Sequence, residues 1–195
     1  MKTRTYFLAV TGADPVLGWM CFFLLSGTIF WGIMLRILSK GFLGPATAQY
    51  PTGKPFSIFA LQFPFSHSRL QQFLALLPPK ALKPLLWSLK LDYLFMAFAY
   101  PFLACSAWYL LRNDQPSGFL AGYEATVMQS LRWGTALPFL AWLLDIVENL
   151  LLSSALRRLS FFKSRAILLA NLLKWACVVF VVLLLLITGT NNFFS

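Results

Sequence analysis

The sequence has very little negative charge. Only 6 of its 195 residues are Asp or Glu, and charged residues of both signs make up 11% of the chain. Hydrophobic residues make up 59% and aromatic residues 17%. So few charges cannot cover the surface of a water-soluble domain, and the chain is therefore predicted to be an integral membrane protein.

The excess of basic residues does not indicate a nucleic-acid binder. The chain has 16 Lys and Arg and a net charge of +10. A nucleic acid needs a broad basic face exposed to water, and so apolar a chain offers none. We therefore interpret the basic residues as markers of the cytoplasmic side of a membrane.

Histidine and cysteine are scarce. His67 is the only histidine, which excludes a histidine-rich metal site, and Cys21, Cys105 and Cys177 stand singly inside apolar runs. No GxSxG, HExxH, P-loop or GxGxxG motif is present. The sequence predicts no metal and no cofactor, and the cysteines are interpreted as buried structural thiols.

Four apolar stretches are long enough to cross a membrane, since a bilayer core of about 30 Å needs roughly 20 residues of helix. They cover about residues 16–38, 85–111, 131–156 and 166–188. We predict an all-α fold, a polytopic membrane protein with four transmembrane helices in a single domain, residues 1–195. Pro101 is expected to kink the second helix. A further short helix is expected over residues 118–128.

The segment between the first two helices, residues 41–83, is rich in proline. Within it, Leu70, Phe73, Leu74 and Leu77 follow the i, i+3, i+4, i+7 spacing of one helix face. This spacing predicts an amphipathic segment that lies in the membrane interface without crossing it.

The loop charges predict the orientation in the membrane. One end of the bundle receives Lys40, Lys54, Arg69, Lys80, Lys83, Arg157, Arg158, Lys163 and Arg165, and the other receives Lys2, Arg4 and Arg112. The first end is predicted to be cytoplasmic, which places both termini on the periplasmic side of a bacterial inner membrane. Lys2 and Arg4 argue in the opposite direction.

Four ionisable residues interrupt the apolar helices: Asp92, Asp145, Glu148 and Lys174. Each costs about 3 kcal/mol at the bilayer centre on insertion scales, so such residues mark pairing or function. At 1.5 Å per residue, Asp145 and Lys174 lie ~17 Å and ~14 Å from the basic ends of their helices. These depths predict one polar layer, in which Asn149, Asn171, Tyr93 and Tyr100 are available to complete hydrogen bonds.

The predicted layer is unbalanced. A pair between Lys174 and an acid of the third helix would lock the last two helices together. Three carboxylates and one ammonium nevertheless leave a charge of −2 if all are ionised. Either a carboxyl is protonated, with Glu148 or Asp92 the expected one, or a cation balances the sum. That cation is a bound ion or ligand, or the side chain of Lys90 or Arg132 reaching inward.

Two short motifs resemble those of a known group. Residues 91–95 read Leu-Asp-Tyr-Leu-Phe, and residues 145–149 read Asp-Ile-Val-Glu-Asn. They resemble helices two and three of a group of bacterial four-helix membrane proteins with no known activity. The similarity extends loosely over residues 56–175, and it implies a small four-helix bundle.

Three functions follow as hypotheses. The first is a lipid-binding or assembly protein with a structural polar layer. Its expected partners are membrane lipids, and the alternatives for assembly are a homo-oligomer or a larger membrane complex. The second is a membrane enzyme acting on a lipid or isoprenoid, with Asp92, Asp145 and Glu148 as acid, base or cation stabilisers. The third, a proton- or cation-coupled transporter, is disfavoured because the chain has no internal repeat. A cavity open to lipid favours the enzyme, whereas a dry, paired core favours the first hypothesis.

Overall fold

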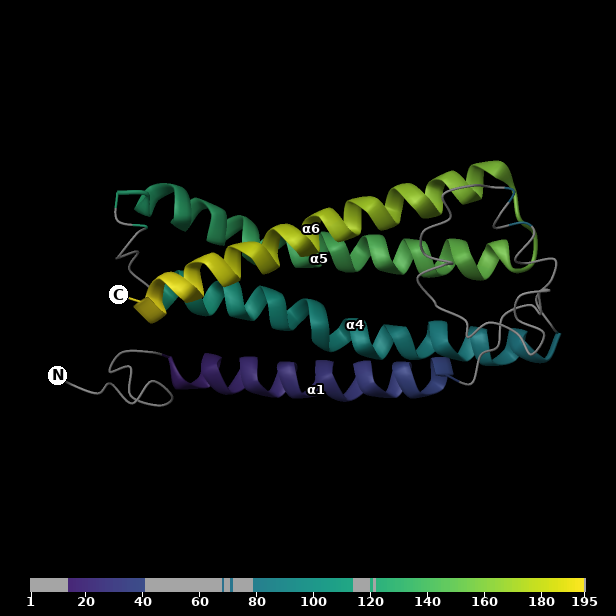
Figure 1. Ribbon diagram of the computed structural model, residues 1–195, viewed down its shortest axis with the longest axis horizontal. Coiled ribbons are helices and arrows are strands. Elements are labelled where there is room, and N and C mark those ends of the chain that lie inside the picture. The colour runs from purple at the N-terminus through teal and green to yellow at the C-terminus, as the bar shows by residue number, and fades with distance from the viewer. Residues whose placement is uncertain are drawn as a thin grey trace.

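The computed structural model describes residues 14–40, 68, 71, 79–113, 120 and 122–194. These residues form four long helices, α1 (Pro15–Lys40), α4 (Pro79–Asn113), α5 (Glu124–Ala155) and α6 (Phe161–Phe194) (Figure 1). Each contains a stretch long and apolar enough to cross a membrane. The predicted all-α class with four membrane-spanning helices is confirmed.

The helices extend beyond the apolar stretches. α5 begins at Glu124 instead of near residue 131, and α6 ends at Phe194 instead of near residue 188. Hydropathy marks only the part of a helix that lies in hydrocarbon, whereas the backbone hydrogen bonds continue into polar turns. The separate helix expected over residues 118–128 is therefore wrong, because its second half is the start of α5.

Of the interfacial segment predicted over residues 41–83, the structure describes residues 68 and 71, both helical, and residues 79–83, which form the start of α4. α4 begins at Pro79, a residue type that suits the first turn of a helix because the missing N–H has no partner there. The amphipathic spacing from Leu70 to Leu77 lies outside the described residues, and its interfacial position stays a prediction.

Side chains fix the ends of two helices. Asp14 caps α1, because its Oδ1 accepts hydrogen bonds from the backbone N–H of Val16 at 3.1 Å and Leu17 at 3.4 Å. At the short connection between α5 and α6, Lys163 of α6 donates from Nζ to Ser154 Oγ of α5 at 2.6 Å. It also donates to the carbonyl of Arg158, within the connection, at 2.9 Å. The connection therefore holds α5 and α6 as an antiparallel pair.

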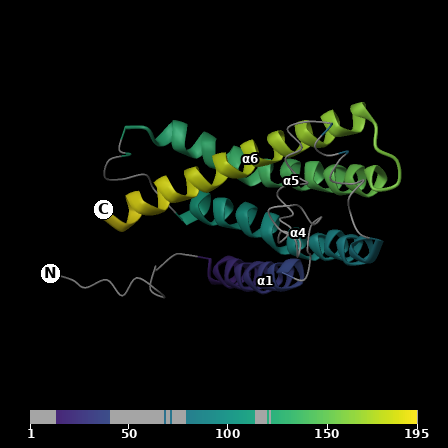
Figure 2. The same ribbon diagram turned by 45° about the vertical axis from the view of Figure 1, so that its right-hand side comes forward.

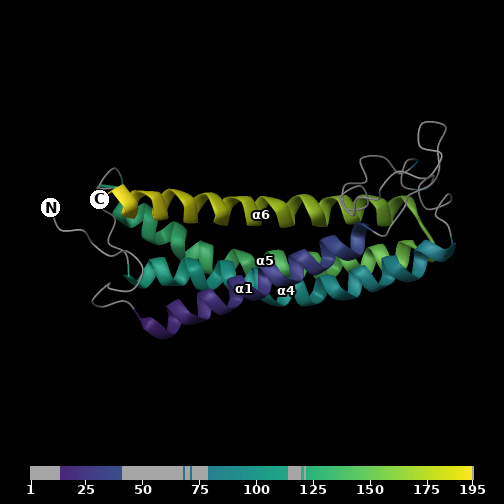
Figure 3. The ribbon, with the colours of Figure 1, turned by 60° about the horizontal axis from the view of Figure 1, so that its bottom comes forward.

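The helices pack as a three-helix unit with α1 on its outside. α4 and α5 pack against each other, α5 packs against α6, and α4 touches α6 over a shorter stretch. α1 packs along α4 (Figures 1 and 2). In Figure 3, α1 crosses obliquely in front of α4 and α5. α1 is accordingly the least buried of the four spans.

Small residues set the close contacts between helices. A Cβ atom on Gly27 of α1 would lie 2.1 Å from Phe98 Cδ1 of α4, so only glycine fits there. A Cβ on Gly134 of α5 would lie 3.2 Å from Ala107 Cβ of α4 and 3.1 Å from Leu184 Cδ2 of α6. At Gly134, therefore, α4, α5 and α6 approach one another closely.

Prolines interrupt the hydrogen bonding of two helices without ending them. Pro101 lies within α4 and Pro138 within α5. Each lacks the N–H that would bond to the preceding turn. The ribbons of both helices change direction along their length in Figure 1.

Candidate functional site: a buried ionic layer

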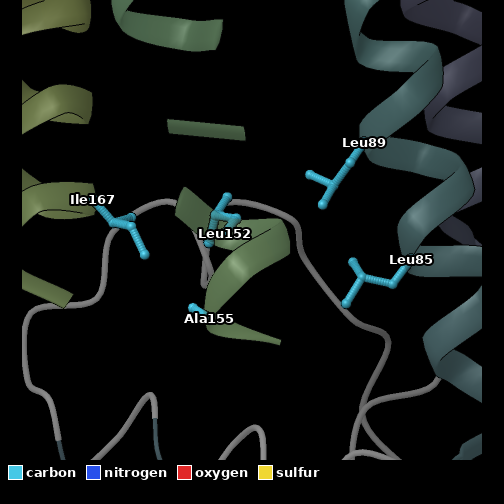
Figure 4. Packing of buried hydrophobic residues seen from close by; sticks show 5 residues of the cluster. All are labelled: Leu85, Leu89, Leu152, Ala155 and Ile167. Atoms are coloured by element: carbon cyan, nitrogen blue, oxygen red, sulfur yellow. The ribbon is translucent and has the colours of Figure 1, made fainter. Parts of the chain in front are cut away.

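Polar side chains from α4, α5 and α6 gather between two apolar clusters. The first cluster consists of Leu85, Leu89, Leu152, Ala155 and Ile167 (Figure 4). The second consists of Met96, Tyr100 and Ala141, with Tyr93, Trp142, Cys177 and Val178 packed against it. Between them along the three helices lie Asp92, Asp145, Glu148, Asn149, Asn171 and Lys174. We call these six residues, with the Tyr100 hydroxyl, the ionic layer.

Lys174 joins α6 to α5 at the centre of the layer. Its Nζ lies 2.9 Å from Asp145 Oδ1 and 2.5 Å from Glu148 Oε2. The two acids are three residues apart on α5, so both face the same side of that helix. The exposed fractions are 3% for Lys174, 5% for Asp145 and 0% for Glu148. The predicted pairing of Lys174 with these acids is confirmed, and one ammonium serves both carboxylates.

Tyr100 connects α4 to the same ion pairs. Its hydroxyl donates a hydrogen bond of 2.6 Å to Asp145 Oδ2. Both oxygens of Asp145 are thus engaged, one by the ammonium of Lys174 and one by the phenol. A charge-assisted bond of this kind is stronger than one between neutral groups, so α4, α5 and α6 are tied together at one carboxylate.

Asp92 forms the edge of the layer. Its Oδ2 accepts a hydrogen bond of 2.8 Å from Asn149 Nδ2, which is a second link between α4 and α5. Asn149 is fully buried, whereas Asp92 is only half-buried. Asn171, also fully buried, is the contribution of α6 beside Lys174.

The ionic layer has more negative than positive groups. Within the described part of the chain, Lys174 is the only cation within ion-pair distance of its acids. Lys90 and Arg132 are exposed, and the Lys90 ammonium lies 5.2 Å from the centre of the Trp87 ring. The idea that either side chain reaches inward to balance the layer is therefore wrong, because α4 turns Lys90 away from Asp92.

The hydrogen bonding of the layer is also incomplete on the acceptor side. Glu148 Oε1 and Asn149 Oδ1 are buried and meet no hydrogen-bond donor among the described residues. A carboxylate oxygen in this position carries the cost of desolvation with nothing to offset it. A proton on one carboxyl makes the charge of the layer less negative and adds a hydrogen-bond donor. The geometry therefore favours a neutral acid.

The described residues contain no cluster of three or more His, Cys, Asp and Glu side chains arranged to hold a metal ion. Cys21, Cys105 and Cys177 are free thiols and half-buried. None belongs to the ionic layer, and Cys177 packs against the second apolar cluster.

Sequence reasoning named Tyr100 among the side chains that could complete the hydrogen bonds of the layer, and its hydroxyl does bond to Asp145. It missed the pairing of Asn149 with Asp92. The available signal was spacing. Asp145 and Asn149 are four residues apart on one face of α5, so both can bond to side chains of the same neighbouring helix.

No protein-family model, curated protein sequence or solved structure matches this chain. The resemblance to bacterial four-helix membrane proteins therefore assigns no family. The established description is a four-helix membrane bundle with buried ion pairs between Lys174 and both Asp145 and Glu148.

Proposed function

We propose that the protein is a non-enzymatic membrane scaffold that binds lipids or assembles with other membrane proteins. The closure of the ionic layer carries this proposal. Lys174, Asp145 and Glu148 are 5% exposed or less. A catalytic acid or base must come within hydrogen-bond reach of its substrate, whereas the bonds of these groups run to one another and to the buried Tyr100 hydroxyl.

The direction of the bonds supports a structural role. The hydrogen bonds that the acids of the layer accept from Lys174, Tyr100 and Asn149 each join two different helices: α5 to α6 through Lys174, and α4 to α5 through Tyr100 and Asn149. In lipid, apolar burial does not draw helices together, because the surroundings are as apolar as the interface. Polar pairing then supplies specificity of helix association.

A membrane enzyme acting on a lipid or isoprenoid is the second candidate, and one observation favours it. Asp92 is half-buried, so one acid of the layer reaches the surface of the bundle. Its neighbours Asp145 and Glu148 lie behind it in the closed part, which leaves Asp92 without a second accessible acid or base.

The scaffold proposal is tested by removing the charge of the layer in two ways. Lys174→Met leaves Asp145 and Glu148 without their cation, and we expect it to lower the free energy of unfolding by about 3 to 5 kcal/mol. Adding Asp145→Asn and Glu148→Gln removes those charges, and we expect most of the stability to return. Thermal unfolding in detergent measures both changes, and native mass spectrometry records the lipids and proteins that co-purify.

A scaffold retains its co-purified lipids and partners in the stable triple variant. A triple variant that folds but loses them would show that the charges themselves serve the function. Isotope-labelled lipids in vesicles provide the enzymatic arm. A labelled product formed by the wild type and absent with Asp92→Asn would overturn the scaffold proposal in favour of the enzyme.

A further inference from the structure

A groove lies at the opposite end of the bundle from the ionic layer, where α1 begins and α6 ends. It has a volume of about 440 Å³ and is lined by Gly18, Cys21, Phe102, Ser106, Tyr109, Leu110, Leu185 and Gly189. The lining belongs to α1, α4 and α6, so the groove exists because α1 packs along α4 and leaves space beside α6. All eight residues lie within the membrane-spanning stretches.

Glycines keep the groove open on two sides. A Cβ atom on Gly189 would meet no atom of the described residues within 4 Å. A Cβ on Gly18 would lie 3.9 Å from Tyr109 Cε2, an ordinary contact distance. Neither glycine is required for close helix packing, unlike Gly27. Among the described residues, therefore, no atom fills the space in front of Gly189.

The length of the groove indicates what fills it. On α4 the lining runs from Phe102 to Leu110, which corresponds to about 12 Å of helix axis. A leaflet of hydrocarbon is about 15 Å thick, half of the roughly 30 Å core. A transmembrane helix of a partner would need a groove across both leaflets, whereas an acyl chain occupies one.

An arginine follows the groove lining on α4. Arg112 lies one helical turn beyond Tyr109, and its guanidinium lies 5.4 Å from the centre of the Trp108 ring. One of its nitrogens donates to Asp14 Oδ2 at 3.3 Å, and the side chain remains 55% exposed. Asp14 also caps α1, so its charge is shared with the helix N-terminus. Arg112 therefore retains N–H donors for an anionic oxygen.

We propose that the groove binds one glycerophospholipid. An acyl chain lies against Phe102 and Leu185, and the phosphate accepts hydrogen bonds from Arg112. The apolar lining matches the acyl chain of such a lipid, and Arg112, just beyond the lining, matches its phosphate. An Arg with a neighbouring Trp is suited to the membrane interface. This site specifies the lipid partner of the proposed scaffold and rests on that function.

The site is tested on the full chain in detergent by titration with dioleoylphosphatidylglycerol and, in parallel, dioleoylglycerol, followed by native mass spectrometry. Gly189→Leu fills the groove, and Ala176→Leu, on an exposed face of the same helix, is its matched control. Arg112→Gln removes the phosphate contact, and Arg132→Gln removes an exposed arginine of α5, which does not line the groove. Thermal unfolding confirms that each variant is folded.

We expect Gly189→Leu and Arg112→Gln to weaken phosphatidylglycerol binding about tenfold or more, with both controls unchanged. Dioleoylglycerol is expected to bind the wild type as weakly as phosphatidylglycerol binds Arg112→Gln. Equal binding to wild type and Gly189→Leu would overturn the site. Loss of a co-purified protein or of a dimer with Gly189→Leu, at unchanged lipid binding, would also overturn it, because the occupant would then be a helix.

These results are separable from the scaffold test. The groove variants leave the ionic layer intact, and the layer variants leave the groove intact. An active enzyme with a lipid in this groove would refute the scaffold alone, whereas an empty groove in a stable, inactive protein would refute the lipid site alone.

Discussion

At the scale of single residues, the acids of the ionic layer differ in the number of hydrogen bonds that they accept. Asp145 accepts from two donors, Lys174 Nζ and the Tyr100 hydroxyl, whereas Glu148 accepts from Lys174 alone. Asp145 is thus the better-stabilised anion of the pair. The two carboxyls of α5 are expected to differ in charge, although they lie beside the same ammonium.

Glu148 is expected to be the neutral acid of the layer at neutral pH. Its Oε1 is buried without a donor among the described residues, and a proton there removes one uncompensated charge. Infrared spectroscopy should show a protonated-carboxyl band near pH 7 that disappears with Glu148→Gln. Glu124→Gln, at an exposed position of the same helix, is the control and should leave the band unchanged. A band that survives Glu148→Gln in full would assign the proton elsewhere.

Tyr100→Phe removes one hydrogen bond while preserving the ring that packs in the second apolar cluster. Because the lost bond is made to a charged acceptor, we expect a loss of about 1.5 to 3 kcal/mol in unfolding free energy. Denaturant unfolding in detergent measures it. Tyr123→Phe, at an exposed tyrosine, should have no measurable effect. Equal stability of Tyr100→Phe and wild type would show that the bond contributes nothing.

The sequence was informative about which residues form the site and less so about their partners. The depths of Asp145 and Lys174 predict their meeting, because rise per residue is the same in every helix. The choice of Asn149 as partner of Asp92, and the outward position of Lys90, depend on the rotation of α4. That rotation is set by the packing of apolar side chains from three helices against one another. The sequence pattern of a single helix carries no information about this packing.

At the scale of helices, the contact between α1 and α4 depends on Gly27. A methyl group there would overlap the Phe98 ring, so Gly27→Ala is expected to destabilise the protein by about 1 to 3 kcal/mol. Gly32→Ala is the control, because a Cβ there would lie 3.6 Å from Phe95 Cε2, an ordinary contact. Thermal unfolding of the two variants provides the comparison. Equal melting temperatures would mean that α1 shifts without cost.

The existence and number of helices followed from hydropathy, but their ends did not. Apolar length detects the spans because a helix satisfies its backbone hydrogen bonds within itself in lipid. The first turns of α5 around Glu124 and of α6 at Phe161 lie beyond the expected stretches. Local hydrogen bonds, such as those that Lys163 of α6 donates across the α5–α6 connection, set these ends.

At the scale of the whole molecule, the acids outside the layer lie at one end. The described ones, Asp14 and Glu124, lie at the end where α1 begins. At the other end, the connection between α5 and α6 carries Arg157 and Arg158, and the first turn of α6 carries Lys163. The positive-inside rule predicts that this second end is cytoplasmic.

Cysteine labelling in sealed cells tests this orientation. In a background with the three native cysteines replaced by serine, Glu124→Cys should react with an impermeant maleimide added outside, and Arg158→Cys should react only after the membrane is permeabilised. Both positions are exposed in the structure. The reverse pattern would invert the topology. Unfolding of the cysteine-free parent controls for damage by the serine replacements.

The sharing of one ammonium by two carboxylates also constrains how the chain is made. Ribosomes release α5 before α6, so Asp145 and Glu148 reach the membrane before the lysine that compensates them. An intramembrane acid is costly to insert alone, at about 3 kcal/mol on translocon-based scales. α5 is therefore expected to wait at the insertion machinery until α6 arrives and then to enter lipid with it as a hairpin. A photocrosslinker placed in α5 should therefore crosslink to the insertion machinery when the nascent chain is truncated within the α5–α6 connection, and it should lose that crosslink when the chain includes α6.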